Sequence, residues 1–296
     1  MLIKTELIVL KLHFYAFHNV ITSQFTPLTE FVISRRYKIF HTGQWTINQV
    51  TVTVNQSVEK LNPDLVDARD MFWHKKEREN PRLYNGTLAS LHYLEAKDHH
   101  LEIVLCETCY RDLLFSNENA KKWLSNGQFE NFSRALGISA VMVTIDNELI
   151  ILHRSSVVGE YPNLLDVPGG HIDVETEFNQ FTPEQLFESI CAEVRGELGL
   201  TDQEFEVLRC IGYMENIEIH KPELVFSGKT SLSSEQIKKR AQQAQESFEF
   251  NHLEFYPGDR KNLATFLHES GHKFTPSAEG CLAVYLEYLN KTGEIV

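Results

Sequence analysis

Residues 166–200 combine a glycine-containing bend with a helix whose two ends are encoded in the local sequence. Thr182 is suited to cap this helix, Pro183 to occupy its first position, and Gln185 to complete a capping box. Gly199 stands where a residue in the left-handed conformation commonly ends a helix. Together these signals predict a helix over residues 183–198.

The predicted helix has two faces of different character. An apolar stripe on one side predicts burial against a core, and it consists of Phe187, Ile190, Val194 and Leu198. Glu193 and Glu197 are four residues apart and share another side, where two like charges repel by roughly a few tenths of a kcal/mol. Taken alone, such a pair is more often a solvated surface. A hard cation such as Mg²⁺ offers the alternative, because it binds carboxylate oxygens together with substrate phosphates.

The bend Val167-Pro168-Gly169-Gly170 lies upstream of the helix. Two glycines after a proline allow the backbone to approach a ligand closely and direct the loop toward the helix. The bend therefore favours a ligand site over a solvated surface for the two glutamates.

The surrounding sequence mixes strand and helix signals. β-Branched runs on either side of Asp146-Asn147 predict a hairpin of residues 138–145 and 148–152. Further strands are expected at 50–54, 101–105, 210–214, 223–226 and 252–255. Helices are expected at 65–76, around 121–124, over about 13 residues after a capping box at Ser233, and at 276–289. This mixture favours an α/β sandwich over a parallel repeat.

The charge balance limits the class of partner. The chain has 28 Lys and Arg against 41 Asp and Glu, a net charge of −13. This balance argues against a nucleic-acid or anionic-membrane binder, because neutralising phosphates needs a basic surface. A small phosphorylated substrate is still compatible, since a local cation or a bound metal can invert the field.

The cysteines and the N-terminal sequence predict the compartment. Five cysteines, most of them among apolar residues, indicate reduced thiols in the cytoplasm, with the nucleus as the alternative. The Cys106–Cys109 pair lacks the second pair of a zinc ribbon, so metal or redox use is the less favoured interpretation. The longest apolar run near the N-terminus covers only residues 7–10, so we expect neither a secretory signal nor a membrane span.

The helix and the bend together resemble the Nudix box, G-x5-E-x7-R-E-U-x-E-E-x-G-U, in which U is aliphatic. Residues 192–200 match its last nine positions with two departures: Ala192 replaces the arginine, and Gly196 replaces the first glutamate of the pair. Glu184 falls at the earlier glutamate position. Thirteen residues instead of five separate Gly170 from Glu184, so the box is expanded.

Other stretches resemble one atypical branch of the Nudix hydrolases, the diphosphatases of UDP-glucose and UDP-galactose, in which the box is also expanded. These stretches are residues 83–86, 110–114, 165–171 and 275–280. The resemblance covers about 64–289 and implies a Nudix α/β/α sandwich with a mixed sheet. We expect an N-terminal extension of unknown structure at 1–60, an α+β substrate-recognition region at 61–135 and the Nudix domain at 136–291.

The resemblance implies roles for ten residues. Glu193 and Glu197 would be the catalytic residues and would hold Mg²⁺, with Mn²⁺ as an alternative. Substrate contacts are implied for Tyr84, Tyr110, Arg154, Gly159, Asp166, His171, Asp173 and Ser277. Tyr84 would stack on uracil, and Arg154 suits a diphosphate. Without the resemblance, the tyrosines would pass for half-buried aromatics, Arg154 for an edge-strand charge and Ser277 for a helix cap.

The expected activity is Mg²⁺-dependent hydrolysis of UDP-sugars to UMP and a hexose 1-phosphate. The expected partner is this small substrate, with no nucleic acid, membrane or protein partner. Glu184, Glu188 and Glu223 are all candidates for the general base. Two alternatives stay open: a hydrolase of another nucleoside diphosphate derivative, and a Nudix-fold nucleotide-binding module with weak catalysis, which Ala192 and Gly196 favour.

Overall fold

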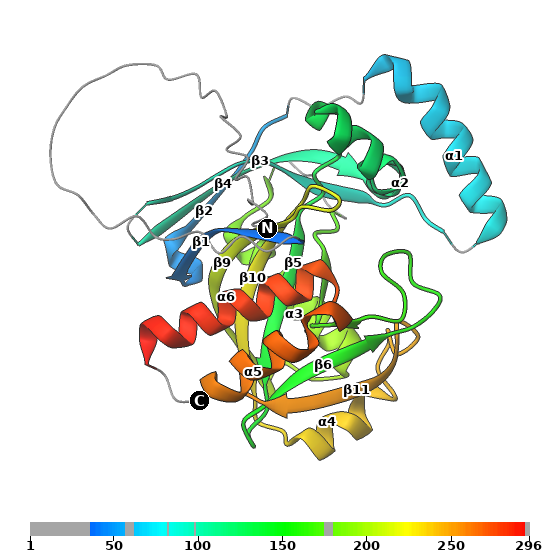
Figure 1. Ribbon diagram of the computed structural model, residues 1–296. Helices are drawn as coiled ribbons and strands as arrows, with labels where there is room; N and C mark the ends of the chain where they lie inside the picture. The colour runs from blue at the N-terminus through cyan, green and yellow to red at the C-terminus, as the bar shows by residue number, and fades with distance from the viewer. Residues whose placement is uncertain (1–35, 57–61, 82, 98, 175–179, 294–296) are drawn as a thin grey trace, which may run out of the picture. The chain divides into compact units, whose positions relative to one another are not determined.

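Two β-sheets form the scaffold of the protein, and helices cover them (Figure 1). The computed structural model describes residues 36–56, 62–81, 83–97, 99–174 and 180–293, which all belong to one unit. The absence of a secretory signal, predicted from residues near the N-terminus, falls outside the described residues.

The larger sheet is mixed. Within the described residues it has eight strands, and its main path runs β1-β9-β10-β5-β6-β11, with β7 beside β6 and β8 beside β5. The β10–β5 pair is parallel, whereas the neighbouring pairs are antiparallel. The strands are β1 (Tyr37–Trp45), β5 (Gly137–Val143), β6 (Glu148–Arg154), β7 (Leu165–Asp166), β8 (Gly169–His171), β9 (Phe205–Asn216), β10 (Lys221–Thr230) and β11 (Phe250–Pro257).

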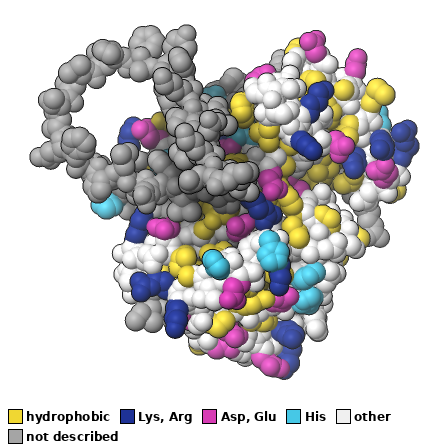
Figure 2. Space-filling model, viewed as in Figure 1, with side chains coloured by type: hydrophobic (Ala, Val, Ile, Leu, Met, Phe, Trp, Pro, Cys, Tyr) yellow, Lys and Arg dark blue, Asp and Glu magenta, His cyan; other side chains and the backbone are white. Residues whose placement is uncertain are grey.

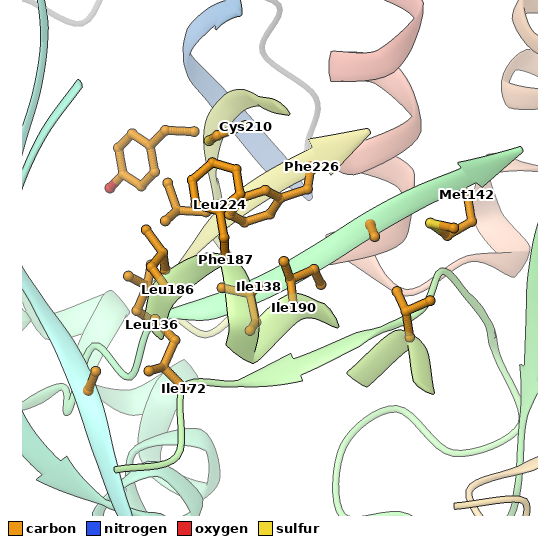
Figure 3. Close-up of a cluster of buried hydrophobic side chains, with 14 of the residues drawn as sticks. Leu136, Ile138, Met142, Ile172, Leu186, Phe187, Ile190, Cys210, Leu224 and Phe226 are labelled. Atoms are coloured by element: carbon orange, nitrogen blue, oxygen red, sulfur yellow. The ribbon is translucent and has the colours of Figure 1, made fainter. Parts of the chain in front are cut away.

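Helices cover both faces of this sheet because its central strands alternate their side chains between two cores. On β5, Ile138 and Met142 point into one core with α3 (Pro183–Leu198) and α4 (Ser234–Ala241). Val141 and Val143 point into the other core, with α5 (Arg260–Ser270) and α6 (Pro276–Thr292). Figure 3 shows side chains of the first core. The predicted α/β/α sandwich with a mixed sheet is therefore confirmed.

A second, smaller sheet lies within the same unit. Its order is β2-β4-β3, and two helices accompany it. The elements are β2 (Val50–Val54), β3 (Thr87–Lys97), β4 (His100–Cys109), α1 (Val66–Glu79) and α2 (Tyr110–Asn126). Short 3-10 turns occupy Ile47–Gln49, Pro63–Leu65, Phe129–Asn131 and Gly271–Lys273. The predicted strand at residues 50–54 is β2, and β1 precedes it, so residues 37–54 contribute one strand to each sheet.

Backbone hydrogen bonds join the start of β3 to the segment after the glycine bend. The Ala89 N–H donates to the Ile172 carbonyl at 3.0 Å, and the Val174 N–H donates to the Thr87 carbonyl at 3.0 Å. The segment that directly follows the bend is therefore hydrogen-bonded to the smaller sheet. This junction brings residues of both sheets to the edge of one cavity.

Two local predictions need correction. The helix after Ser233 has eight residues rather than about 13, because the chain turns after Ala241 and the Glu246 N–H bonds to the Gly196 carbonyl of α3 at 3.0 Å. The predicted hairpin turn joins β5 to β6, but only Val143 and Leu149 pair across it. The two strands diverge because β5 pairs with β8 and β10, whereas β6 pairs with β7 and β11.

The acidic excess of the chain does not form one patch on the described part of the visible face. Figure 2 shows basic and acidic side chains interspersed there. The carboxylates that matter most for the site are largely buried.

A substitution at Ile190 tests the predicted apolar face of α3, because the Ile190 side chain has no exposed surface. We expect Ile190→Ala to lower the free energy of unfolding by about 2–5 kcal/mol through lost burial and a residual cavity. Chemical denaturation measures this change. Glu184→Ala, on the same helix but facing solvent, is the matched control, and an equal loss in both variants would contradict the assignment of the buried face.

Candidate active site

A cavity of about 1160 Å³ lies where the bend, α3 and the start of β3 meet. Nine of the ten residues singled out from the sequence, all of them described in the structure, line it: Tyr84, Tyr110, Arg154, Gly159, Asp166, His171, Asp173, Glu193 and Ser277. The tenth, Glu197, lies behind the bend and is only 3% exposed. The volume is sufficient for a dinucleotide-sized ligand, because pockets for small molecules commonly measure about 300–1,000 Å³.

The glycine bend rests directly on the two helix carboxylates. The Gly169 N–H donates to Oε2 of Glu197 at 2.9 Å. At Gly170, a Cβ atom would lie 2.6 Å from Cδ of Glu193, so a larger residue would displace that carboxylate. Glu193 and Glu197 therefore lie on the same side of α3, beneath the bend.

Acidic neighbours surround this carboxylate pair. Burial, followed by the charges of Glu246, Glu249 and Asp173, raises the pKa of Glu193 to about 8. Burial and the charges of Glu193 and Glu249 raise the pKa of Glu197 well above its usual range, against the Gly169 hydrogen bond. A cation bound beside these carboxylates would favour their charged forms and so oppose both shifts.

Glu193 and Glu197 form one wall of the cavity, here called the acidic wall, and its donor atoms fit a hard divalent cation. Carboxylate oxygens are the ligands that Mg²⁺ prefers, and Glu193 and Glu197 are the residues that would hold it. In the described part of the chain, no three carboxylate, imidazole or thiolate side chains are gathered closely enough to hold a metal by themselves. A cation held by Glu193 and Glu197 alone would keep coordination positions for water or phosphate oxygens.

Arg154 faces this acidic wall as a positioned cation. Its Nη1 donates to Oδ2 of Asp166 at 2.8 Å, and its Nε donates to the Glu160 carbonyl at 3.1 Å. Asp166 is held in turn by the hydroxyl of Thr275, which donates to Oδ1 at 3.1 Å. These bonds fix the guanidinium group at the cavity, where it suits a phosphate oxygen.

A second ion pair, which sequence reasoning missed, forms part of the cavity wall. Nζ of Lys221 lies 2.9 Å from Oε2 of Glu160. Burial opposes ionisation of Glu160, but the charge and hydrogen bond of Lys221, together with the charge of Arg154, hold its pKa at about 2. The two partners are 61 residues apart and carry no shared motif, so only the tertiary structure pairs them.

His171 lies beside this pair and is a neutral imidazole. Burial and the charge of Lys221 lower its pKa to about 3, despite Glu160 nearby. Its Nε2 atom is buried and makes no hydrogen bond within the described residues. His171 can therefore donate a hydrogen bond to a ligand, or accept one from it, and stay uncharged near neutral pH.

The structure separates the three candidates for the general base. Glu184 and Glu188 do not line the cavity, and Glu188 pairs with Arg195 at the surface. Glu223 lines the cavity, accepts a hydrogen bond from Ser139 Oγ at 2.6 Å, and has a pKa raised by burial to about 7.

The remaining predicted contacts lie around the rim and the far wall. Tyr84 is 80% exposed, as an aromatic ring open to stacking would be. Tyr110 approaches Gly159 so closely that a Cβ there would lie 2.9 Å from the phenol oxygen. Ser277 stands in the first turn of α6, and its hydroxyl donates to Glu223 at 3.4 Å.

Comparisons with known proteins identify relatives of this chain. The chain is 25% identical to Nudix hydrolase 9 of Arabidopsis thaliana over 252 residues, covering 74% of this chain and 81% of the relative. It is 26% identical to the human uridine diphosphate glucose pyrophosphatase NUDT22 over 246 residues, covering 74% of this chain and 80% of the relative. The chain is a homologue of Nudix hydrolases. The predicted resemblance and the predicted enzyme class, a Nudix-type hydrolase, are confirmed.

No protein-family profile matches the chain. Among solved structures, an Ap4A hydrolase of C. elegans in a binary complex is similar at 14% identity and a TM-score of 0.35, covering 53% of this chain and 99% of that one. In the described part of this Nudix homologue, no helix is both long and apolar enough to traverse a bilayer.

The raised pKa values predict how stability depends on pH without added metal. Glu193 and Glu223 have folded-state pKa values above the ordinary 4.5, so they favour the folded state most below pH 4.5. Their contribution is lost as the pH rises through about 7 and about 8. We expect Glu193→Gln to raise the melting temperature at pH 8.5 and to change it little at pH 4.5.

Differential scanning fluorimetry over this pH range measures the effect, with EDTA present. Glu235→Gln, a solvent-facing change on α4, is the control. A stabilisation by Glu193→Gln that is equal at both pH values would contradict the assigned pKa.

Proposed function

We propose that this Nudix homologue hydrolyses the diphosphate linkage of UDP-sugars, UDP-glucose and UDP-galactose among them, to UMP and a hexose 1-phosphate. The observation that carries the proposal is one cavity bordered by the Glu193–Glu197 wall, the positioned Arg154 and the exposed ring of Tyr84. The name of the human relative supports the substrate class. The absence of any disulfide among the five cysteines agrees with a cytoplasmic location.

The base and the diphosphate of the substrate each have a partner in the cavity. Tyr84 stacks on the uracil ring at the open rim, and Arg154 binds non-bridging oxygens of the diphosphate. The bend supplies backbone close to the phosphates, because glycine leaves room for that approach. His171, whose buried Nε2 makes no hydrogen bond within the described residues, donates a hydrogen bond to the substrate or accepts one from it.

The catalytic residues have two roles, which are to hold a cation beside the phosphates and to accept a proton from the attacking water. Glu193 and Glu197 would hold a divalent cation, Mg²⁺ or Mn²⁺, and this cation would supply positive charge beside the phosphate oxygens. Glu223 acts as the general base, since its pKa of about 7 lets it accept a proton from the attacking water near neutral pH. Ser139 and Ser277, which both donate to this carboxylate, orient it.

Turnover tests the proposal directly. We expect purified protein with Mg²⁺ and UDP-glucose to release UMP, detected by chromatography, and Glu197→Gln to abolish the release while the protein stays folded by circular dichroism. Glu235→Gln is the control and keeps wild-type turnover. Thermal stabilisation by UDP-glucose without any turnover would identify a binding module instead. Turnover of ADP-ribose but not of UDP-sugars would identify a hydrolase of another nucleotide.

Substrate-contact variants test the two ends of the cavity separately. We expect Tyr84→Ala to raise KM for UDP-glucose by about tenfold with little change in kcat, because stacking contributes about 1–3 kcal/mol per base. We expect Arg154→Lys to lower kcat/KM by a larger factor, because one ammonium cannot reproduce the bidentate guanidinium contact. Steady-state kinetics measures both. A Tyr84→Ala enzyme with wild-type KM would remove the uracil role from this residue.

A further inference from the structure

Helix α2, which accompanies the smaller sheet, presents one of its faces to the cavity. The residues of α2 that line the cavity are Tyr110, Leu114, Asn117 and Glu118. Their spacing is that of one side of a helix. This face therefore contributes a polar side chain, Asn117, which no motif in the sequence singled out.

Asn117 is bonded to Glu160, which belongs to the loop between β6 and β7. Nδ2 of Asn117 donates to Oε1 of Glu160 at 2.6 Å. Because an ionised carboxylate only accepts hydrogen bonds, the end of the amide that meets Glu160 must be the nitrogen. The other end, Oδ1 of Asn117, is buried and makes no hydrogen bond within the described residues.

His171 brings a second such atom to the same carboxylate. Its Nε2 is buried without a hydrogen bond and lies 3.8 Å from Oε2 of Glu160. Within the described residues, Asn117 and His171 are the only residues lining the cavity that have a buried side-chain atom of this kind. Buried polar groups are nearly always hydrogen-bonded, so two exceptions around one carboxylate indicate a partner from outside the chain.

Lys221 supplies hydrogen-bond donors beside these two atoms. Its Nζ donates to Oε2 of Glu160 at 2.9 Å. Lys221 and Glu223 are two residues apart on β10, so their side chains share the face of the strand that meets the cavity. An ammonium group has three N–H donors, of which Glu160 accepts one. Donors and acceptors are therefore mixed at this place.

The balance of charge and hydrogen bonding selects the class of ligand. The charges of Lys221 and Glu160 cancel, and the amide of Asn117 is neutral. The diphosphate of a nucleotide sugar has acceptors and no donor, so it leaves Oδ1 of Asn117 unsatisfied and is repelled by Glu160. A sugar hydroxyl donates and accepts, so neighbouring hydroxyls can satisfy Asn117 and Lys221 together.

Arg154 joins this cluster to the part of the cavity assigned to the diphosphate. Its Nε donates to the backbone carbonyl of Glu160 at 3.1 Å. A diphosphate bound by the guanidinium group therefore ends close to Glu160. With the uracil ring assigned to Tyr84, the hexose is the part of the substrate that remains to be bound there.

We propose that Asn117, Glu160, Lys221 and His171 form a hexose subsite, in which Oδ1 of Asn117 accepts a hydrogen bond from a sugar hydroxyl and Lys221 donates one to the sugar. The subsite combines a helix of the smaller sheet's half with strands of the larger sheet. This inference rests on the proposed function, since it assumes that a nucleotide sugar enters the cavity.

Binding of an uncleavable ligand tests the subsite without relying on turnover. The probe is UDP-glucose with a methylene group in place of the bridging diphosphate oxygen, and UDP is the ligand without a hexose. We expect Asn117→Ala to weaken binding of the probe about five- to tenfold in titration calorimetry, the usual effect of one lost hydrogen bond, and to leave UDP binding unchanged.

Asn126→Ala is the matched control, because it removes an exposed asparagine from the same helix outside the cavity. We expect it to bind both ligands as the wild type does. Equal weakening of the probe and of UDP by Asn117→Ala would place the nucleotide at this cluster and overturn the hexose subsite.

Probes that lack one sugar hydroxyl give the sharper test. We expect the wild-type chain to bind one of these deoxy probes about five- to tenfold more weakly than the full probe, and Asn117→Ala to bind the two equally. This pattern identifies the hydroxyl that Asn117 binds. If the wild-type chain binds every deoxy probe as tightly as the full probe, the proposal is wrong, and this measurement requires no variant to fold.

The failures of the two proposals are distinguishable. A chain that hydrolyses UDP-glucose, but in which Asn117→Ala binds the probe with wild-type affinity, keeps the proposed function and loses the hexose subsite. A chain that binds the probe with the expected dependence on Asn117, but releases no UMP, keeps the subsite and loses the catalytic activity. Absence of any binding of the probe to the wild-type chain overturns both.

Discussion

The contact between the glycine bend and helix α3 organises the site. The Gly169 N–H donates to Glu197, and Gly170 leaves room for the Glu193 carboxylate. A buried carboxylate is costly unless it is hydrogen-bonded or bound to a cation, so this contact is what allows Glu197 to lie under the bend. The same contact fixes the bend above the pair, and the cavity opens beside it.

The cavity is divided electrostatically. On one wall, burial raises the pKa values of Glu193, Glu197 and Glu246, and the charge of Glu249 raises each of them further. Elsewhere in the cavity, Arg154 and Lys221 are held by Asp166 and Glu160 in ion pairs within hydrogen-bonding distance. An anionic ligand would meet ordered cations on one side, and a bound divalent ion would be needed to bring it against the carboxylates on the other. This division explains how a chain with an acidic net charge can accommodate a phosphorylated ligand.

Much of the sheet and helix order follows from local patterns. The helix at residues 183–198 was predictable to the residue, because Thr182, Pro183 and Gly199 mark its ends by side-chain capping and backbone conformation. The site was harder to predict from the sequence. Nine of the ten residues singled out line the cavity, but most of them were recognisable only through the resemblance to a family. Lys221 and Glu160 had no signal at all, because their pairing depends on a contact between distant segments.

The sequence by itself determined the capped helix, the acidic pair one turn apart and the glycine bend, since these depend on interactions within a few residues. The tertiary structure decided that the bend lies on the pair, that Arg154 faces it, and that Asn117 of α2 bonds to Glu160. Those outcomes depend on the packing of α3 between the two sheets and on the contact of α2 with the loop after β6. Neither has a local signature, because each joins residues far apart in the chain.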